Sequence, residues 1–269
     1  MEPLLKWVGG KRWQVDSLRA MIGNHRVVEP FCGGAAVTLG VEPKRALLND
    51  INPHLINFYQ QVQAGAPFDI AGLNPAMYYS YRAHFNQLMD IGCANTQEAA
   101  ELFYALNHWG FNGLWRVNSS GYYNVSRGHD KWPGRIPNFN EARELFNHYI
   151  FTCADFESLA VSDGDFIYAD PPYDGTFDGY ASEGFNWRDQ ERLAYWLAKH
   201  PGPFVLMNAL TDRVCELYSD LGFMWTEYGA SQSMHHSRGR TGKISEVMAF
   251  NTQFIVDNDH ALIHDGSHV

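Results

Sequence analysis

The run Asp170-Pro171-Pro172-Tyr173 is the part of the sequence whose residue types and spacing are best suited to chemistry. A carboxylate at Asp170 can accept one N–H of an exocyclic aromatic amine, and the carbonyl of Pro171 can accept the other. Because the two prolines lock their φ angles, the direction of that carbonyl is fixed. The ring of Tyr173 offers a face on which a flipped base can stack. Asp170 can also stabilise the positive charge that develops on an amine nitrogen during group transfer.

A plain turn is the alternative interpretation of this run, because Asp-Pro-Pro commonly ends a strand. Residues 165–170 are apolar between two acids and predict a strand, which the prolines would stop because proline cannot donate to a ladder. The chemical interpretation is favoured because a motif of this kind requires a particular structural context. That context is a strand before the motif and, upstream, a glycine loop that could bind a nucleoside.

Two upstream segments place polar residues or glycines directly after apolar runs. Residues 25–31 run into Gly33 and Gly34, and residues 45–50 end in Asp50. Ligands of open α/β sheets bind outside the carboxyl ends of the strands, so these segments and Asp170 should converge. The loop lacks G-x-G-x-x-G, which disfavours a dinucleotide. Gly33 and Gly34 allow the backbone to approach a ligand closely, and Asp50 can accept hydrogen bonds from the hydroxyls of a ribose. This combination suits a nucleoside such as S-adenosylmethionine, although a glycine loop after a strand is often only a turn.

The elements that must position these residues alternate between strand and helix, which predicts an α/β fold with a doubly wound, mostly parallel sheet. Strands are expected over residues 25–31, 45–50, 149–153, 165–170, 204–207, 223–228 and 244–250. Helices are expected from Pro53 and over residues 76–91, 97–109, 188–200 and 211–221. Residues 110–140 are rich in Gly, Asn, Ser and Pro and predict a loop or hairpin. The expected division is a main domain over 1–55 and 145–254, a mainly helical insert over 56–144 and a loose tail over 255–269.

Composition excludes several classes of protein. In 269 residues no apolar run approaches the roughly 20 residues that cross a bilayer, and the first residues do not form a secretory signal, so a cytoplasmic location without a membrane partner is expected. The four cysteines form no C-x-x-C pair and the histidines lack ligand spacing, so no metal site is expected.

The net charge of −10 is unfavourable for a nucleic-acid partner, but its distribution is uneven. Residues 107–143 hold five Lys or Arg against two acids, and residues 230–243 hold three basic residues and no acid. These segments are either basic contact surfaces on an acidic body or solvated loops, and charge alone favours solvated loops.

In the order and spacing of five segments, the chain resembles the Dam-type DNA adenine N6-methyltransferases. The segments are Lys6-Trp-Val-Gly-Gly-Lys11, Glu29-Pro-Phe-Cys-Gly33, Asn49-Asp-Ile-Asn52, Asn112-Gly-Leu-Trp-Arg116 with Gly121-Tyr-Tyr-Asn-Val125, and Asp170-Pro-Pro-Tyr173. The resemblance covers residues 4 to about 251. It implies methyl transfer from S-adenosylmethionine, without a metal, to adenine N6 in double-stranded DNA, and an enzyme that works as a monomer. The insert becomes the target-recognition domain, and Asp170, Pro171, Pro172 and Tyr173 become the catalytic residues.

The same resemblance implies a role for each residue at a matching position. Cofactor contacts fall on Trp7, Lys11 near the methionine carboxylate, Glu29, Pro30, Phe31 and Gly33 at the methionine end, Asp50 at the ribose, Asp155 and Phe156 at the adenine, and Asp170. For Trp7, core packing is an equal alternative.

DNA contacts are implied for the insert and for the second basic segment. Arg116 could pair with a guanine and Asn112 or Asn118 with an adenine, while Phe111 or Leu114 could fill the space that a flipped base leaves. Phosphate contacts are expected from Arg127, Lys131, Arg238, Arg240 and Lys243, and for Lys131 a solvated loop is an equal alternative. The chain has Asn124-Val125-Ser126-Arg127 where the family has Asn-Val-Pro, so the usual G-A-T-C target is in doubt.

Two other functions compete with this one. A methyltransferase for rRNA bases or protein glutamine would often carry Asn at the first position of the Asp170 motif and would lack the segment from Lys6 to Lys11. A catalytically silent DNA-binding module would not need the intact motif. The aspartate at position 170 and the segment from Lys6 to Lys11 both favour a DNA adenine methyltransferase.

Overall fold

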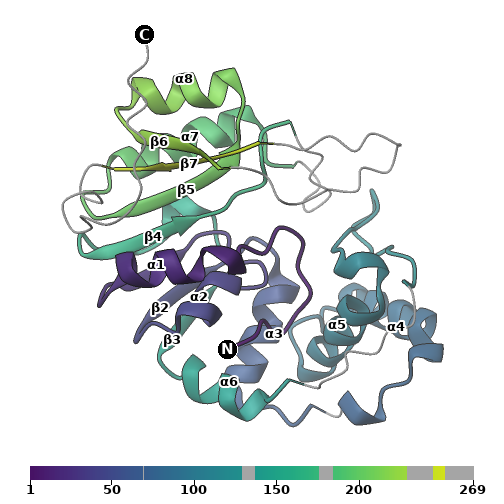
Figure 1. The fold of residues 1–269 in the computed structure, drawn as a ribbon. Coiled ribbons are helices and arrows are strands. Elements are labelled where there is room, and N and C mark those ends of the chain that lie inside the picture. Colours follow the sequence, from purple (N-terminus) through teal and green to yellow (C-terminus); the bar gives the residue numbers. More distant parts are fainter. Residues whose placement is uncertain (69, 129–136, 176–183, 229–244, 252–269) are drawn as a thin grey trace.

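A seven-stranded sheet with the strand order β3-β2-β1-β4-β5-β7-β6 forms the centre of the computed structural model (Figure 1). The structure describes residues 1–68, 70–128, 137–175, 184–228 and 245–251. The strands are β1 (Arg26–Glu29), β2 (Ala46–Asn49), β3 (Tyr149–Thr152), β4 (Asp165–Ala169), β5 (Phe204–Ala209), β6 (Met224–Tyr228) and β7 (Glu246–Phe250). The pairs among β1 to β5 are parallel, and β7 runs antiparallel between β5 and β6. The predicted α/β fold with a mostly parallel sheet is confirmed.

Helices cover both faces of the sheet. The helices are α1 (Val15–Ile22), α2 (Ala36–Val41), α3 (Pro53–Ala64), α4 (Tyr78–Asp90), α5 (Gln97–Trp109), α6 (Phe139–Phe146), α7 (Trp187–Ala198) and α8 (Asp212–Asp220). One face is covered by α1, α2 and α3 and the other by α7 and α8 (Figure 1). Each face has its own cluster of buried apolar side chains. The sheet is therefore the middle layer of three, as in doubly wound folds.

Local sequence explains why the central elements form. All five residues of β4 are buried, which is typical of a strand covered on both faces. Val28 in β1 pairs with Leu47 on one side and Ile167 on the other, so apolar residues fill the middle of the sheet. The helix predicted from Pro53 begins there, and the side chain of Asn52 accepts hydrogen bonds from its first turn.

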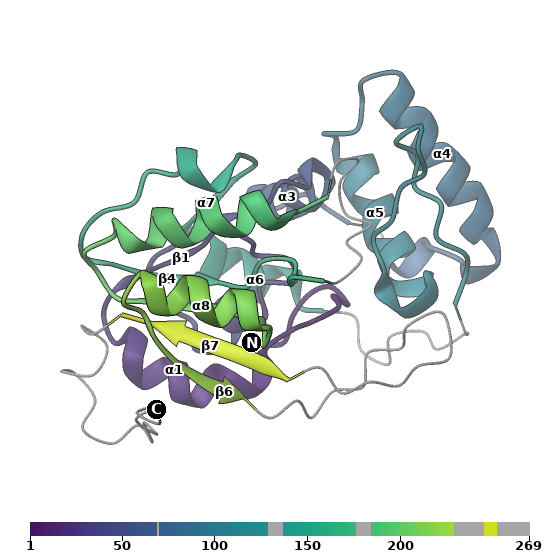
Figure 2. The same ribbon diagram turned by 90° about the horizontal axis from the view of Figure 1, so that it is seen from above.

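The middle of the chain adds helices that lie to one side of the sheet. In both views α4 and α5 lie beyond α3, away from β6 and β7 (Figures 1 and 2). The ring centroid of Phe58 on α3 lies 6.0 Å from that of Tyr104 and 6.2 Å from that of Phe103, both on α5. These contacts join the middle segment to the apolar cluster beneath the sheet. Because α3 runs through residue 55, the predicted domain boundary there falls inside a helix, and the division at 56 and 144 remains a prediction.

Beyond α5 the chain forms the expected hairpin-like loop. Isolated antiparallel bridges join Gly110 to Arg127 and Val117 to Tyr123. The predicted tail over 255–269 lies outside the described residues. Among the helices that the structure describes, none is both long enough and apolar enough to cross a membrane.

Candidate active site

The polar residues that were expected to converge do meet at the carboxyl edge of the sheet. Asn49, at the end of β2, is the buried centre of this edge. Its Nδ2 donates to the carbonyls of Pro30 and Ala154, both at 2.9 Å. Its Oδ1 accepts from the hydroxyl of Thr152 at 2.9 Å and from the backbone N–H of Ala154 at 3.1 Å. One amide therefore ties together the loops that follow β1, β2 and β3.

The glycine loop after β1 is held on both sides. The carbonyl of Gly33 accepts from the hydroxyl of Tyr59 at 2.9 Å. Gly33 has a φ of +45°, and a Cβ atom there would lie only 2.6 Å from Nε1 of Trp7. At Gly34 a Cβ atom would lie 2.8 Å from Cβ of Trp7. Trp7 thus packs directly on the loop backbone, which explains why two glycines stand there.

Asp50 binds the same loop, and Glu29 binds the helix that follows it. Asp50 accepts from the backbone N–H of Gly33 through Oδ2 and from that of Asn52 through Oδ1, both at 3.0 Å. Glu29 is buried, and its Oε1 accepts from the backbone N–H of Thr38 at 2.8 Å and from the Thr38 hydroxyl. Burial raises the pKa of Glu29 to about 7 and also raises the pKa of Asp50. Oε1 of Glu29 therefore bonds the first turn of α2.

Asp170 lies after β4 and shares its pocket with the N-terminal segment. Its Oδ2 is 3.3 Å from Nζ of Lys11, whose side chain is buried and also donates to the carbonyl of Gly9 at 3.0 Å. Burial raises the pKa of Asp170, whereas the charge of Lys11 opposes that rise. The other oxygen, Oδ1, is buried and has no hydrogen-bond partner among the residues that the structure describes. A buried oxygen of this kind has the capacity to accept from a group that enters the pocket.

Tyr173 completes this pocket. Its ring lies 4.9 Å from Nζ of Lys11, and its hydroxyl donates to Oε2 of Glu246 at 3.2 Å. Burial and then repulsion by Asp170 raise the pKa of the Tyr173 hydroxyl, so the hydroxyl remains a donor. Lys11, Asp170, Tyr173 and Glu246 therefore form one cluster, although they come from three distant parts of the chain.

A buried amide network supports the Pro-Pro turn. Nε2 of Gln190 on α7 donates to the carbonyl of Pro172 at 2.8 Å. Asn208 on β5 donates to Oε1 of Gln190 at 2.9 Å and accepts from the backbone N–H of Asp174 at 2.9 Å. The peptide groups on either side of Tyr173 are thereby bonded to side chains of the sheet and of α7.

Asp155 and Phe156 follow β3, where the resemblance placed them. Both oxygens of Asp155 accept from Nη2 of Arg192 on α7, at 2.9 and 3.0 Å. The buried ring of Phe156 lies 5.6 Å from that of Phe31, and the Arg192 guanidinium lies 4.9 Å from the Phe156 ring centroid. Phe31 also packs edge-on against Phe185 at 5.4 Å. These side chains form an aromatic wall with an acid at its exposed end.

The predicted DNA-reading residues occupy the hairpin that follows α5. Phe111 is 47% exposed, and Asn112 has a φ of +55° in the short turn Phe111–Gly113. Leu114 is partly buried against the main apolar cluster. Arg116 donates through Nε to Oδ1 of Asn124 at 2.7 Å. Oδ1 of Asn118 accepts from the backbone N–H groups of residues 120 and 122, both at 3.0 Å, so this oxygen supports the turn itself.

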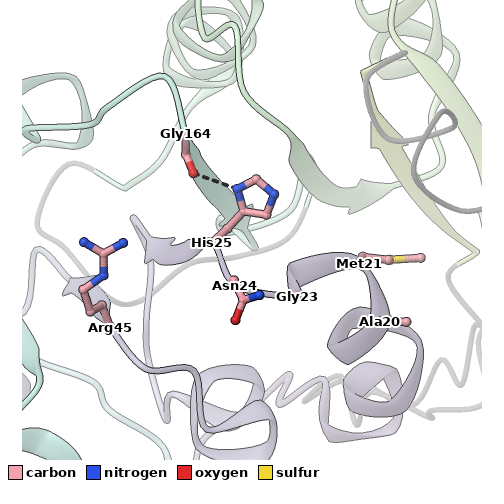
Figure 3. Close-up of a pocket in the computed structure, with 7 residues that line it drawn as sticks. All are labelled: Ala20, Met21, Gly23, Asn24, His25, Arg45 and Gly164. Carbon is pink, nitrogen blue, oxygen red and sulfur yellow. Dashed lines mark hydrogen bonds between the residues drawn. The ribbon is translucent and has the colours of Figure 1, made fainter.

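Arg127, whose backbone is bridged to Gly110, is half-buried in this hairpin. The remaining predicted phosphate contacts, Lys131, Arg238, Arg240 and Lys243, lie outside the described residues. A shallow pocket at the opposite edge of the sheet, near the amino ends of the strands, contains none of the predicted site residues (Figure 3). It is lined by Ala20, Met21, Gly23, Asn24, His25, Arg45 and Gly164.

Residues 7–234 match the family model described as D12 class N6 adenine-specific DNA methyltransferase. The chain belongs to this family. It is 34% identical to the retron Ec67 DNA adenine methylase of Escherichia coli over 268 residues, which cover 93% of this chain and 91% of that protein. It is 33% identical to the DNA adenine methylase of Vibrio cholerae (92% and 95% covered) and 30% identical to the type II methyltransferase M1.LlaDCHI of Lactococcus lactis (93% and 95%). The protein is therefore an adenine-specific DNA methyltransferase, and DNA is its substrate.

The residues of the methyltransferase fit the cofactor that its family implies, S-adenosylmethionine. The buried Oδ1 of Asp170, which has no hydrogen-bond partner among the described residues, can accept from an amine such as that of the cofactor's methionine end. Within the described ranges, no group of three or more His, Cys, Asp or Glu side chains could hold a metal ion.

Several residues of the methyltransferase site were not predicted from sequence. They are Glu246, Gln190, Asn208, Arg192 and Asn107, the last of which bonds the backbone of Lys6. Each lies within a strand or helix and has no local motif. Only the fold brings these residues to the site. In the sequence, each is marked by nothing more than a polar side chain in a segment with apolar neighbours.

Proposed function

We propose that this methyltransferase transfers the methyl group of S-adenosylmethionine to the N6 amine of an adenine flipped out of duplex DNA, at a specific site, into the Asp170–Tyr173 pocket. The observation that carries the proposal is the buried, unpaired Oδ1 of Asp170, next to the ring of Tyr173. A flipped base has the two features that match this arrangement, a stacking face and an exocyclic N–H donor.

Asp170 supports the reaction in two ways. Oδ1 accepts one N6 hydrogen and the Pro171 carbonyl accepts the other, which draws the lone pair out of conjugation with the ring. The carboxylate then stabilises the positive charge that forms on N6 as the carbon–nitrogen bond forms and the carbon–sulfur bond breaks. The cofactor supplies an electrophilic methyl group and leaves as S-adenosylhomocysteine. The excess proton on N6 is lost afterwards to solvent.

Lys11 keeps Asp170 in the state that this chemistry needs. An ammonium 3.3 Å from Oδ2 favours the ionised carboxylate and opposes the effect of burial. Gln190 holds the carbonyl of Pro172, and the locked φ angles of the two prolines fix the direction of the Pro171 carbonyl. The pocket is therefore organised before the base enters, which is the condition for electrostatic stabilisation of a transition state.

Residues 56–144 are proposed to form the target-recognition domain, and residues 1–55 and 145–254 the catalytic domain. The exposed ring of Phe111 can enter the space that the flipped base leaves. Arg116 is held at the hairpin surface by Asn124, where it can reach a base edge. We infer that Trp7, Glu29, Pro30, Phe31, Gly33, Asp50, Asp155 and Phe156 surround the cofactor, and that the enzyme acts as a cytoplasmic monomer.

Transfer of tritiated methyl groups to duplex DNA, rRNA and protein tests this proposal. Label should appear in DNA as N6-methyladenine, and label confined to RNA or protein would refute it. Asp170→Ala should lower the rate by roughly two to three orders of magnitude, because it removes the group that stabilises the transition state. S-adenosylhomocysteine binding should fall only in part. Asp163→Ala is the control, since Asp163 is an exposed aspartate before β4. Full turnover by Asp170→Ala would rule out the assigned role.

A further inference from the structure

Glu246 is a second carboxylate in the catalytic pocket, and no motif of the chain points to it. It is the first residue of β7, which pairs antiparallel with β5 so that Glu246 stands opposite Ala209. This pairing puts the start of β7 at the edge where β5 ends, and hence beside the Asp170–Tyr173 turn. The Glu246 side chain is 17% exposed. A carboxylate so far removed from water needs partners in the protein.

Those partners are residues of the catalytic cluster. Oε2 of Glu246 accepts from the hydroxyl of Tyr173 at 3.2 Å and lies 3.8 Å from Nζ of Lys11. The same ammonium is 3.3 Å from Oδ2 of Asp170. Lys11 therefore stands between the two carboxylates and is the counter-ion for both. This arrangement holds Glu246 in position although its own strand contributes no cation there.

The direction of the Tyr173 hydroxyl hydrogen decides whether Asp170 or Glu246 can accept a hydrogen bond from an incoming group. The hydroxyl has one hydrogen and lies within reach of both carboxylates, and its bond to Oε2 of Glu246 directs that hydrogen away from Asp170. Oδ1 of Asp170 then keeps its lone pairs for the incoming amine. Without an acceptor at position 246, the Tyr173 hydrogen is no longer directed away from Asp170, and a bond between the two would occupy the catalytic carboxylate and change the position of the stacking ring.

We propose that Glu246 is a positioning residue for methyl transfer, which binds the Tyr173 hydroxyl so that the ring is fixed and Asp170 is left free to accept the target amine. The proposal rests on the function proposed above. It predicts that an acceptor at position 246 is needed, that the effect passes through the Tyr173 hydroxyl, and that the chemical step suffers more than binding.

Four variants separate these points. Glu246→Leu removes the acceptor and should lower the single-turnover rate on cognate DNA roughly tenfold, the value of a hydrogen bond to a charged group. Glu246→Gln keeps an amide oxygen that can accept from Tyr173, and should remain within about threefold of the wild type. Tyr173→Phe keeps the ring but lacks the hydroxyl. In its background, Glu246→Leu should cause no further loss, because the interaction is already absent. Glu227→Leu makes the same change at an exposed position on neighbouring β6 and should leave the rate unchanged.

Two binding measurements complete the experiment. The dissociation constants for S-adenosylhomocysteine, by calorimetry, and for cognate DNA, by anisotropy, should change less than threefold in Glu246→Leu. Urea unfolding shows whether each variant is folded at the assay temperature. Additive losses in the double variant, or a glutamine variant as slow as the leucine variant, would overturn the positioning role. A wild-type enzyme that does not methylate DNA would instead refute the proposed function, so the two failures are distinguishable.

Discussion

Replacing Asn107 with leucine should both destabilise the methyltransferase and weaken its hold on the cofactor. Asn107 is a buried residue of α5, and its amide makes three bonds to main-chain groups outside this helix. Oδ1 accepts from the N–H of Lys6 at 2.9 Å, and Nδ2 donates to the carbonyls of Lys6 at 2.7 Å and Gly113 at 3.2 Å. Leucine has nearly the same volume but leaves three main-chain groups without their partner. At about 1 kcal/mol for each, the free energy of unfolding should fall by about 2–4 kcal/mol.

The expected loss of cofactor affinity follows from the residues that come directly after Lys6 in the chain. Trp7 packs on the backbone of Gly33 and Gly34, and Lys11 pairs with Asp170. When Lys6 is released from Asn107, the segment from Lys6 to Lys11 must be ordered again on binding. The dissociation constant for S-adenosylhomocysteine should therefore rise about tenfold, equivalent to about 1.4 kcal/mol.

Asn86 provides a matched control for this variant. Asn86 bonds both main-chain groups of Tyr123, as Asn107 bonds both main-chain groups of Lys6. Its Oδ1 accepts from the N–H at 3.0 Å and its Nδ2 donates to the carbonyl at 3.1 Å, but both residues lie within the middle segment. Asn86→Leu should lower the urea midpoint while calorimetry finds the cofactor affinity unchanged. If Asn107→Leu and Asn86→Leu lost stability alike and both kept wild-type affinity for S-adenosylhomocysteine, the link through Lys6 would be refuted.

Three further variants test other parts of the site. Arg116→Ala should broaden the choice of target sequences in a library of duplexes without changing cofactor affinity, because Arg116 is held within the hairpin by Asn124; unchanged site choice would remove it from recognition. Arg192→Leu should raise the dissociation constant for S-adenosylhomocysteine about threefold, and less at high salt, because the partly exposed guanidinium holds Asp155; an unchanged constant at low salt would contradict this. Burial raises the pKa of Glu29 to about 7, above its ordinary value of 4.5, so the folded protein binds the extra proton and loses stability as the pH rises through about 7. Glu29→Gln should flatten this dependence, so that the difference in unfolding free energy between variant and wild type changes by about 3 kcal/mol from pH 4.5 to 8; parallel curves would show that Glu29 does not titrate this way.

The sheet could be predicted because its strands are short apolar runs that end in polar residues. All seven expected strands appear, with ends within three residues of the expected positions. Their parallel pairing also made the convergence of Gly33, Asp50 and Asp170 predictable, since carboxyl ends of parallel strands share one edge. Helices α1, α2 and α6 were not predicted. The residues Ala36–Val41 of α2 include a glycine and β-branched residues, so tertiary packing rather than propensity forms that helix.

The partners of the motif residues could not be predicted in the same way. Asp170 was identified from its neighbours in sequence, but its surroundings depend on β7 lying antiparallel beside β5 and on α7 lying across the sheet. No periodicity in residues 244–250 distinguishes Glu246 from an ordinary polar residue at the start of a strand. Likewise, Asn107 lies in an amphipathic helix where a buried asparagine has no local signature. Such residues become visible only when burial and hydrogen bonds are known together.

The short segment from Lys6 to Lys11 connects the turn that we propose to read the target with the pocket that we propose to be catalytic. At one end Asn107 bonds Lys6 and also the carbonyl of Gly113, which closes the turn carrying Phe111 and Asn112. At the other end Lys11 pairs with Asp170 and Glu246. A Cβ atom at Gly113 would lie 2.6 Å from that of Lys6, so the turn and the segment are in direct contact. A displacement of the turn would therefore be absorbed by this segment or passed along it to the carboxylate of Asp170. Substitutions that alter target choice at the turn should for this reason also change the rate of methyl transfer on sites that are still bound.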